Sequence, residues 1–463
     1  MRTTSKPAIS GSITSSITSS ICTSVAVLLA ASLFIASKAH AAIPIQTWKQ
    51  ASGTQVYLVE SPAIPMVDVQ IDFDAGSRRD PAEKSGLASV TAAMTSKGVL
   101  ARGADAALDE NALSEAWADL GASFGVSAGS DRMSFSLRTL TYPDLMAKAV
   151  KLAARQMGEP TFPEAVWLRE RQRIDGTLRE ANTRPATLAN RAFSTAVYGS
   201  HPYGYDMSEA TLARIDVAQM RTLYAGLMAP CRAKVSIVGA VNRAQADAMV
   251  AELMSRVPQA QNASCTPLPP VAEVLPLARA EDIRIPFQSA QAHVFIGQPG
   301  YPRNDPDHFA LTVGNYILGG GGFVSRLTSE VREKRGLSYS VYSYFAPGLH
   351  AGAFSIGLQT RPDQAAQAVQ VSRDVLARFV SEGPTEVELK AAKDNLIGGF
   401  SLLIDSNRKL LGNLSNVAWN NLPLDYLDTW TQQVDKVTLA DIKAAFARKL
   451  QPEKMVTVVV GGV

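Results

Sequence analysis

The chain has 463 residues, 45 of them basic and 42 acidic, and three of the basic residues fall within the first 41 positions. The rest of the chain has 42 residues of each sign. This balance excludes the basic surface that binding to nucleic acid or to an anionic membrane requires. The length that follows position 41 predicts two or three domains.

The first 41 residues have the features of a secretory signal peptide. Arg2 and Lys6 precede a serine- and threonine-rich stretch, an apolar run covers Ile21 to Ser37, and Ala39 and Ala41 are spaced as in an A-x-A cleavage site. A membrane anchor is the alternative, but the apolar run is shorter than the ~20 residues that a span needs. No later run approaches that length. We therefore expect an exported, periplasmic protein that is soluble once this segment is removed.

Two later segments begin in the same way. An alternating run from Val67 to Asp74 precedes Asp80-Pro81, and an apolar run from Ala292 to Gln298 precedes Asp305-Pro306. Each run predicts a strand. Each Asp-Pro pair suits the N-cap and first turn of the helix that is expected to follow it.

A second correspondence is a segment of 27 residues that occurs twice. Ile215–Val241 and Val437–Val463 align without a gap, and each predicts an amphipathic helix, a proline-marked turn and a buried strand. Between the copies, Val257 to Asp282 contains five prolines and no periodicity, which is typical of a linker. The chain therefore contains one structural unit used twice.

These patterns predict an α+β fold of two homologous domains, residues 42–257 and 283–463, joined by a linker at 258–282. Each domain should have a mainly antiparallel sheet with helices on one face. We expect the two domains to face each other across a cleft, as in a clam shell.

Cys231 and Cys265 are the two cysteines that follow position 41. In an oxidising compartment they can pair. The sequence does not show whether their Cα atoms approach closely enough for a disulfide, so the question is open at this stage.

Standard catalytic motifs are absent from the sequence. None of the four later histidines has another His, Cys or carboxylate at the spacing of a helical zinc motif. The sequence also lacks G-x-S-x-G, a P-loop lysine and a G-x-G-x-x-G that follows a strand. His201, in SHPYG, and His308, early in an expected helix, favour structural or solvated roles.

The remaining candidate is the segment from Gly319 to Phe345, GGGGFVSRLTSEVREKRGLSYSVYSYF. Its four glycines follow an expected helix, which is the wrong context for a phosphate-binding loop. As a bare pattern, they indicate a flexible turn.

Arg332 and Tyr339 lie on either side of a turn within this segment. Ser325 to Arg335 predicts a helix, and Gly336 predicts the turn that ends it. Every second residue from Leu337 to Phe345 is expected on one face of a strand, and Tyr339 is one of these residues. For an arbitrary protein, Tyr339 is best interpreted as a core aromatic residue and Arg332 as a solvated cation.

The stretch ILGGGGFVSRLTSEVREKRGLSYSVYSYF resembles the corresponding segment of the pitrilysin/insulinase-type zinc peptidases. That family includes two-domain bacterial members and the mitochondrial processing peptidase. The order of strand, Asp-Pro-led helix, SHPYG, closing strand, linker and repeat extends the resemblance over the whole chain beyond position 41. In the family, an inverted zinc motif, H-x-x-E-H, lies on the first helix of the N-terminal domain, and its glutamate is the general base.

The chain departs from this motif. In GLASVTAAMTSKG, Ser89 and Ala93 occupy the two histidine positions and Ala92 occupies that of the base. The family's further glutamate ligand lies seven residues after the glutamate of an E-R pair, and counting from Glu170-Arg171 leads to Thr177. The resemblance therefore implies that this chain binds no metal or other cofactor and does not hydrolyse peptides alone.

Arg332 and Tyr339, in contrast, match the spacing of an arginine and a tyrosine that reach the scissile peptide in the family. The resemblance implies that Tyr339 donates to the oxyanion and that Arg332 holds the phenol or a substrate carbonyl. A backbone without Cβ also allows close approach of an extended peptide. The expected substrate-binding residues are Gly319, Gly320, Gly321, Gly322 and Phe323.

Some members of the family divide the site between two homologous subunits. The resemblance implies that this chain is the metal-free subunit of an exported hetero-oligomeric zinc peptidase that acts on peptides, with zinc on an H-x-x-E-H partner. A catalytically inert scaffold subunit, like the core proteins of respiratory complexes, is the alternative. An enzyme with an unrecognised site is the third possibility, and it requires activity from the isolated chain. We expect no nucleic acid partner and no membrane span in the mature chain.

Overall fold

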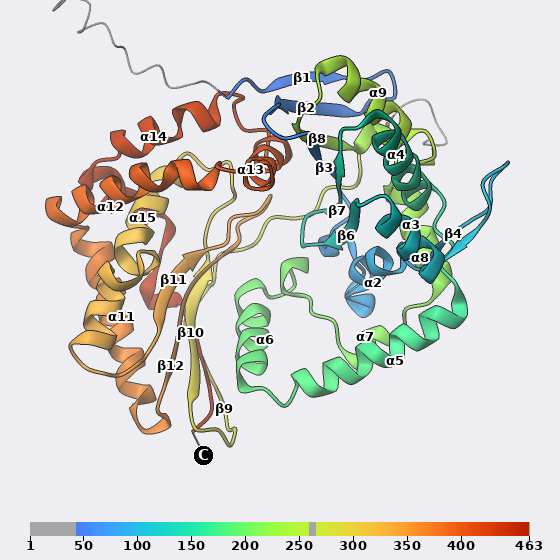
Figure 1. Cartoon of the computed structure of the whole chain (residues 1–463). Coiled ribbons are helices and arrows are strands. Elements are labelled where there is room, and N and C mark those ends of the chain that lie inside the picture. The colour runs from blue at the N-terminus through green and yellow to red at the C-terminus, as the bar shows by residue number, and fades with distance from the viewer. Residues whose placement is uncertain (1–42, 259–264, 463) are drawn as a thin grey trace, which may run out of the picture. The chain divides into compact units, whose positions relative to one another are not determined.

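Two β-sheets, one in each half of the chain, organise the structure (Figure 1). The computed structural model describes residues 43–258 and 265–462, so the expected signal peptide lies outside the described residues. Residues from Pro44 onward form one compact unit. Below, the N-terminal half is residues 44–258 and the C-terminal half is residues 281–462.

The first sheet has six strands in the order β1-β2-β8-β3-β7-β6. The strands are β1 (Gln46–Lys49), β2 (Gln55–Glu60), β3 (Met66–Phe73), β6 (Ser123–Ala128), β7 (Met133–Leu140) and β8 (Lys234–Gly239). Only β2 and β8 pair in parallel. A short ribbon is formed by β4 (Gly98–Val99) and β5 (Leu108–Asp109).

One face of this sheet is buried by helices of the same half. The alternation in β3 places Val67, Val69 and Ile71 in the core, as the sequence predicts. The helices of this half are α2 (Leu87–Met94), α3 (Glu110–Asp119), α4 (Pro143–Gly158), α5 (Glu164–Ala181), α6 (Pro185–Tyr198), α7 (Glu209–Leu212), α8 (Val217–Leu227) and α9 (Arg243–Met254).

The second sheet repeats the first. Its order is β11-β12-β10-β13-β9, which matches β6-β7-β3-β8-β2, and its single parallel pair, β9 with β13, corresponds to β2 with β8. Its strands are β9 (Glu281–Ile285), β10 (Ala292–Pro299), β11 (Val341–Phe345), β12 (Ala353–Thr360) and β13 (Val456–Val460). The two copies of the repeated sequence therefore contribute α8–β8 and α15–β13 at equivalent places.

The C-terminal half has six named α-helices among the described residues, and all but one of them cover one face of this sheet. They are α10 (His308–Asn315), α11 (Ala365–Glu382), α12 (Glu386–Gly399), α13 (Asn407–Trp419), α14 (Tyr426–Lys436) and α15 (Leu439–Lys449). All of them except α13 contribute buried side chains to the core on that face. The α+β fold of two similar domains is confirmed.

Each sheet also packs against one helix of the other half on its opposite face, an exchange that the sequence patterns do not predict (Figure 1). Helix α6 packs on β10 and β13, where Phe193 and Val197 lie with Val456 and Val458. Since Val459 belongs to the core on the other face, α6 covers the side away from α10, α11 and α15.

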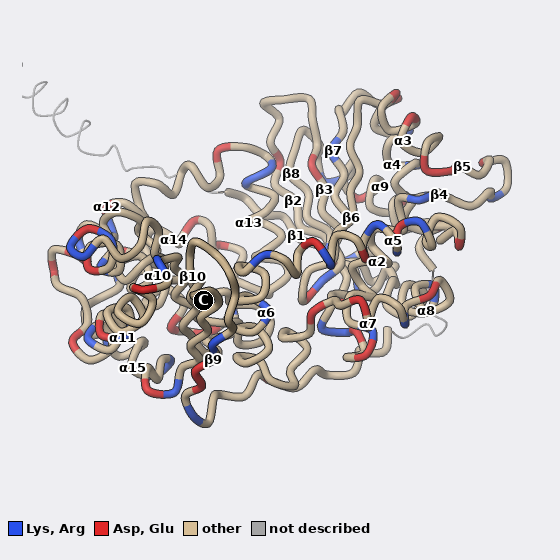
Figure 2. The backbone as a smooth tube through the Cα atoms, turned by 90° about the horizontal axis from the view of Figure 1, so that it is seen from below, with Lys and Arg blue, Asp and Glu red and all other residues tan. Residues whose placement is uncertain are grey.

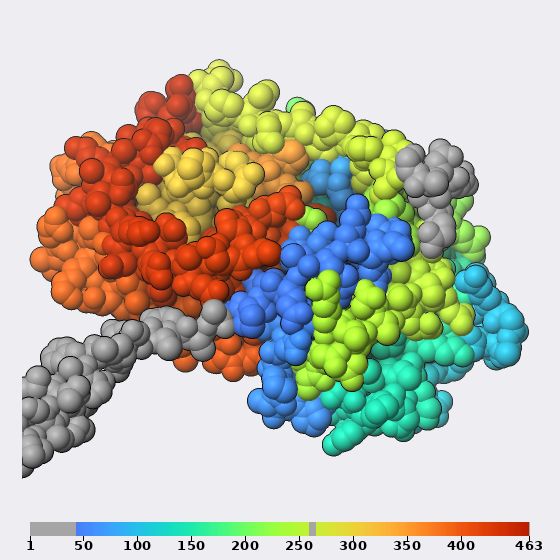
Figure 3. Space-filling model, turned by 90° about the horizontal axis from the view of Figure 1, so that it is seen from above, coloured from blue at the N-terminus to red at the C-terminus, as the bar shows by residue number. Residues whose placement is uncertain are grey.

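Helix α13 covers the first sheet in the same way, packing on β8 and β3. The ammonium of Lys234 donates to the carbonyls of Ala418 and Trp419 at 2.8 and 3.1 Å, and Arg132 lies over the Trp419 ring at 5.5 Å. The hydroxyl of Ser61 in the N-terminal half also donates to Asn407 at 3.0 Å. Figure 3 shows the first strands, in blue, beside the orange-red segment that contains α13 and α14.

The two Asp-Pro pairs do not cap helices in the expected way. The carboxylate of Asp80 accepts from the backbone N–H groups of Gly86 and Ala88, so it caps α2 from several residues upstream. Burial raises the pKa of Asp80 to about 7, against the effect of these donors. Helix α10 begins at His308, and Asp305 accepts from Asp307 within the preceding turn.

In the view of Figure 2, basic and acidic residues are interspersed over both halves of the chain. None of the helices within the described ranges is long and apolar enough to cross a membrane.

Cys231 and Cys265 form a disulfide with Cα atoms 5.9 Å apart, which answers the question left open by the sequence. The bond joins the turn before β8 to the segment that leads toward β9. Gly53 has a positive φ of 89° and packs directly on Cys231, where a Cβ would come within 2.7 Å of the cysteine Cβ. A glycine is therefore needed beside the disulfide.

A variant that carries both Cys231→Ser and Cys265→Ser should have a free energy of unfolding about 2–4 kcal/mol lower than the oxidised wild type, because a cross-link across 34 residues restricts the unfolded chain. Urea denaturation of both proteins measures the difference. The reduced wild type is the control, and its midpoint should match that of the double variant. Equal midpoints for the oxidised wild type and the double variant would contradict the stabilising role.

Candidate active-site residues

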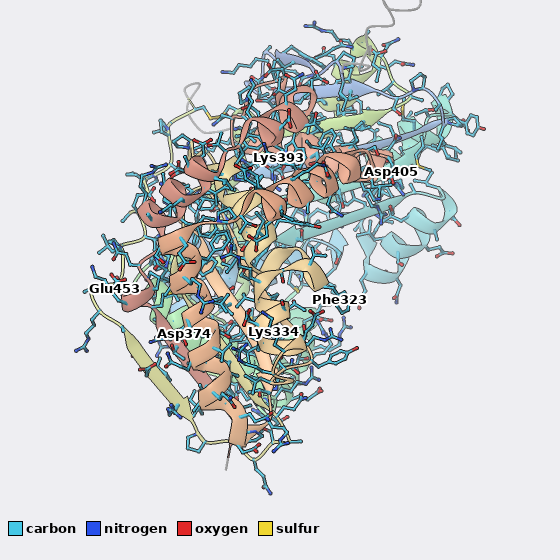
Figure 4. All side chains as sticks on the ribbon, turned by 90° about the vertical axis from the view of Figure 1, so that its left-hand side faces the viewer. Phe323, Lys334, Asp374, Lys393, Asp405 and Glu453 are labelled. Atoms are coloured by element: carbon cyan, nitrogen blue, oxygen red, sulfur yellow. A yellow bond between two sulfur atoms is a disulfide. The ribbon has the colours of Figure 1, made fainter. Side chains whose placement is uncertain are left out.

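Arg332 lies between two exposed aromatic rings. Its guanidinium carbon is 4.7 Å from the ring centroid of Phe323 and 4.7 Å from that of Tyr339. Both distances are within the range of a cation–π interaction. The side chains of Phe323 and Tyr339 remain 68% and 81% exposed. We call these three residues the Phe323–Arg332–Tyr339 stack; Figure 4 labels Phe323 and Lys334, a close neighbour of Arg332 in the sequence.

The backbone that carries Arg332 differs from the expected helix. Residues Thr328–Glu333 form a π-helical segment, η7, in which the N–H of Lys334 bonds to the carbonyl of Ser329. Gly336 follows with a positive φ of 60°, which confirms the expected turn. π-helical turns are rare in proteins overall, but those that occur are often found at functional sites.

The expectation that Tyr339 lies on one strand face with Leu337 and Val341 is wrong. Strand β11 begins at Val341, and Tyr339 lies in a bend before it. Leu337 and Val341 are buried, whereas Tyr339 points to solvent. The reason lies at Ser338, whose hydroxyl is 2.6 Å from the carbonyl of Ser340 and 2.7 Å from that of Gln359 and holds the bend against β12. This exposure also excludes the interpretation of Tyr339 as a core residue.

The cations next to Arg332 are neutralised locally. Lys334 and Arg335 both donate to the carboxylate of Glu330, at 2.6 and 2.7 Å, and these bonds lower the pKa of Glu330. Arg332 has no carboxylate partner among the described residues. Its guanidinium edge is therefore available to a ligand.

Three of the four glycines are explained by packing within the chain. A Cβ at Gly319 would overlap the backbone nitrogen of Ser343 in β11, and Cβ atoms at Gly320 and Gly321 would lie 2.8 Å from Asn315 and 2.6 Å from Tyr316. Gly322 has a positive φ of 61° and nothing within 4 Å of such a Cβ. Only Gly322 leaves open space next to Phe323.

The positions of the family's metal ligands carry no ligands here. Ser89 and Ala93 are exposed on α2, Ala92 is buried, and the hydroxyl of Thr177 on α5 donates to the carbonyl of Arg173 at 3.0 Å. Within residues 43–258 and 265–462, no group of three or more His, Cys, Asp or Glu side chains is placed to hold a metal ion. The side chains present therefore do not fit zinc.

The glutamate of the E-R pair already forms ion pairs with basic side chains of this chain. Glu170 lies 2.8 Å from Arg173 and 3.3 Å from both Lys97 and Arg169. Burial raises the pKa of Glu170, but hydrogen bonds from Arg173 and Lys97 outweigh it and lower the pKa overall. Such a carboxylate is already neutralised, and its neighbours repel a metal cation.

Two histidines have the structural roles that the sequence favours. The Nδ1 atom of buried His201 accepts from the backbone N–H of Tyr203, and its Nε2 atom lies 3.0 Å from the carbonyl of Ala272. The Nδ1 atom of His308 lies 3.0 Å from the hydroxyl of Tyr301, and burial lowers the pKa of His308 to about 3. These contacts account for the position of each histidine, so neither position requires a catalytic role to explain it.

The fold and the site together define a two-domain, zinc-peptidase-like protein that lacks metal ligands at the positions of the inverted zinc motif. The family profile described as insulinase (peptidase family M16) matches residues 55–211, and the one described as peptidase M16 inactive domain matches residues 214–396. The chain belongs to the insulinase family, peptidase family M16.

Individual relatives agree with this assignment. The crystal structure of a peptidase M16 inactive domain from Pseudomonas fluorescens superposes with a TM-score of 0.84 at 35% identity, covering 90% of this chain and 98% of that one. An uncharacterised zinc protease of Streptomyces coelicolor is 28% identical over 265 residues, 56% of this chain and 57% of that protein, so the match spans little more than half of this relative. A non-peptidase homolog of Helicobacter pylori is 32% identical over 155 residues, 33% of this chain and 35% of that one.

Proposed function

We propose that this chain is the metal-free subunit of an exported zinc peptidase that acts on peptides. In this proposal Arg332 and Tyr339 complete a zinc site that a homologous H-x-x-E-H subunit carries. The observation that supports it most is the contact between Arg332 and Tyr339, both available to a ligand, in a chain whose Ser89, Ala92 and Ala93 cannot bind or use zinc.

The stack suits the electrostatic work of peptide hydrolysis. Attack of water on a peptide carbonyl places negative charge on the carbonyl oxygen, which preorganised donors stabilise. The hydroxyl of Tyr339 has no hydrogen-bond partner among the described residues, so it is free to donate to that oxygen. Arg332 holds the ring through its face and directs its remaining N–H donors toward a substrate carbonyl.

Export is supported by two separate features. The first 41 residues have the composition of a secretory signal peptide. The disulfide between Cys231 and Cys265 is of a kind that persists in oxidising compartments such as the periplasm.

The name of the Helicobacter pylori relative, a non-peptidase homolog, fits a member that does not hydrolyse peptides alone.

The proposal is tested by assaying cleavage of unstructured peptides by this chain alone, by an H-x-x-E-H homologue from the same compartment alone, and by both together. We expect no stoichiometric zinc on this chain, no cleavage by it, and high activity only from the pair. The two should form a stable complex that buries upwards of ~2,000 Å².

Two results would contradict the proposal. One tightly bound zinc per chain with chelator-sensitive activity would show a complete site in this subunit. A chain that stays monomeric with every exported H-x-x-E-H homologue would exclude the shared site. A stable complex whose activity does not depend on this chain would favour the scaffold role.

A further inference from the structure

A groove of about 710 Å³ adjoins the Phe323–Arg332–Tyr339 stack. We call it the β11 groove. It lies along the two tyrosines Tyr342 and Tyr344 of β11, and its wall includes Asn190 of α6 and Phe295 of β10. It therefore combines residues of both halves of the chain.

The groove lies at the β11 edge of the second sheet, between the face that α6 covers only in part and a wall that includes residues of α10 and α12. Helix α6 packs on β10 and β13 and reaches Ala353 at the start of β12, and the same face of β11 is left uncovered. Tyr342 and Tyr344 are 44% and 59% exposed on this face, and the ring of Tyr342 lies across Gly357 of β12, where a Cβ would come within 2.5 Å of it. Gly357 thus provides the space in which Tyr342 lies flat on the sheet.

The lining of the groove carries no charged side chain. Its polar groups are amides and hydroxyls, and those of Asn190, Ser340 and Ser355 have no side-chain hydrogen bond among the described residues. A charged group bound here would lose its hydration without gaining an ionic partner. The lining therefore selects uncharged, hydrogen-bonding ligands with apolar or aromatic parts.

None of the three stack residues lines the groove, but sequence neighbours of two of them do. Ser340, which directly follows Tyr339, and Gly322, which directly precedes Phe323, both line it. A peptide held at Arg332 and Tyr339 can therefore extend into the groove. Tyr342 and Tyr344 are two residues apart in one strand, roughly 7 Å, which is also the spacing of alternate side chains in an extended peptide.

Recognition beside Ser343 has to use side chains, because the outer backbone edge of β11 is already occupied at that residue. The Asn315 amide donates to the carbonyl of Ser343 at 3.1 Å, and Gly319 packs on the backbone nitrogen of the same serine. A peptide therefore cannot add to β11 as a further strand at this point. The exposed rings of Tyr342 and Tyr344 remain as the contact surface.

We propose that the β11 groove is a specificity site that binds an uncharged stretch of the peptide substrate bearing aromatic or branched apolar side chains. This inference rests on the proposed function in that it takes the ligand to be the peptide held at Arg332 and Tyr339. It adds the chemical class of substrate and the residues that select it.

Direct binding to the full chain tests the groove without any need for catalysis. Two labelled, unstructured peptides are compared by fluorescence anisotropy: one with a central stretch of Phe, Val, Ser and Gln, and one in which two of those residues are replaced by Asp. The first peptide should bind at least about tenfold more tightly. Tyr344→Asp should remove that preference, and Tyr142→Asp, at a 52% exposed tyrosine outside the groove, should retain it.

Failure of this inference is distinguishable from failure of the shared zinc site. Equal binding of the two peptides by the wild type, or an unchanged preference in Tyr344→Asp, overturns the groove even if the two-subunit enzyme is active. If neither peptide binds the chain alone, the assay is repeated as turnover by the two-subunit complex, and equal turnover of both peptides overturns it. Selective binding without any turnover supports the groove and contradicts the proposed enzyme.

Discussion

Tyr339→Phe should lower the turnover number of the two-subunit complex by about 10²–10³, equivalent to roughly 2.7–4 kcal/mol of transition-state stabilisation. The variant loses only the phenolic hydroxyl. Its ring keeps the contact with Arg332, and because the side chain is 81% exposed, folding and assembly should be unaffected. The loss should appear in turnover more than in peptide affinity, since the donor acts as charge develops on the oxygen.

Steady-state kinetics of the complex measures this effect, with zinc content and assembly checked for each variant. Tyr142→Phe removes the hydroxyl of an exposed tyrosine outside the stack and should behave as wild type. Arg332→Lys should also be impaired, because a point charge does not reproduce the planar fork of donors. Near-normal turnover in an assembled Tyr339→Phe complex would favour the scaffold role instead.

Phe193→Ala should lower the free energy of unfolding by about 3–5 kcal/mol. Phe193 is only 5% exposed, and its ring centroid lies 5.4 Å from that of Phe295. The ring also fills the space beside Gly297, where a Cβ would come within 2.8 Å of it. Because Phe193 belongs to α6 and both partners to β10, this loss measures the packing of a helix from one half on the sheet of the other.

Denaturant unfolding followed by circular dichroism gives the value. Phe323→Ala is the matched control: it removes the same ring from a 68% exposed position and should cost less than about 1 kcal/mol. A Phe193→Ala variant as stable as the wild type would show that α6 does not hold the second sheet.

Several features of this protein follow from local sequence alone. The alternation of β3 and the repeated segments that form α8–β8 and α15–β13 predict the two equivalent sheets, since burial of one face imposes a short period on the chain. The resemblance to the zinc peptidases locates the motif positions, and residue type alone then shows that Ser89, Ala92 and Ala93 offer neither imidazole nor carboxylate there. The prediction of the two sheets depends only on residue type and spacing.

The exchange of helices is a property of the tertiary structure. All five residues of β13 are buried, and a strand that is apolar on both faces indicates a cover on each. That pattern does not specify which helix provides the second cover. The identity of α6 as that helix depends on side chains such as Phe193 meeting Phe295, which lies far away in the sequence.

The geometry of the candidate site likewise depends in part on the local sequence and in part on the tertiary structure. The sequence determined that Arg332 and Tyr339 lie on either side of a turn, because Gly336 adopts the positive φ that ends the helical segment. Tertiary contacts decided that Tyr339 faces solvent, because Ser338 is held by Gln359 of β12 before the strand begins. Local periodicity encodes which face of an element is buried, whereas exposure at a bend is decided by a hydrogen bond to a neighbouring strand.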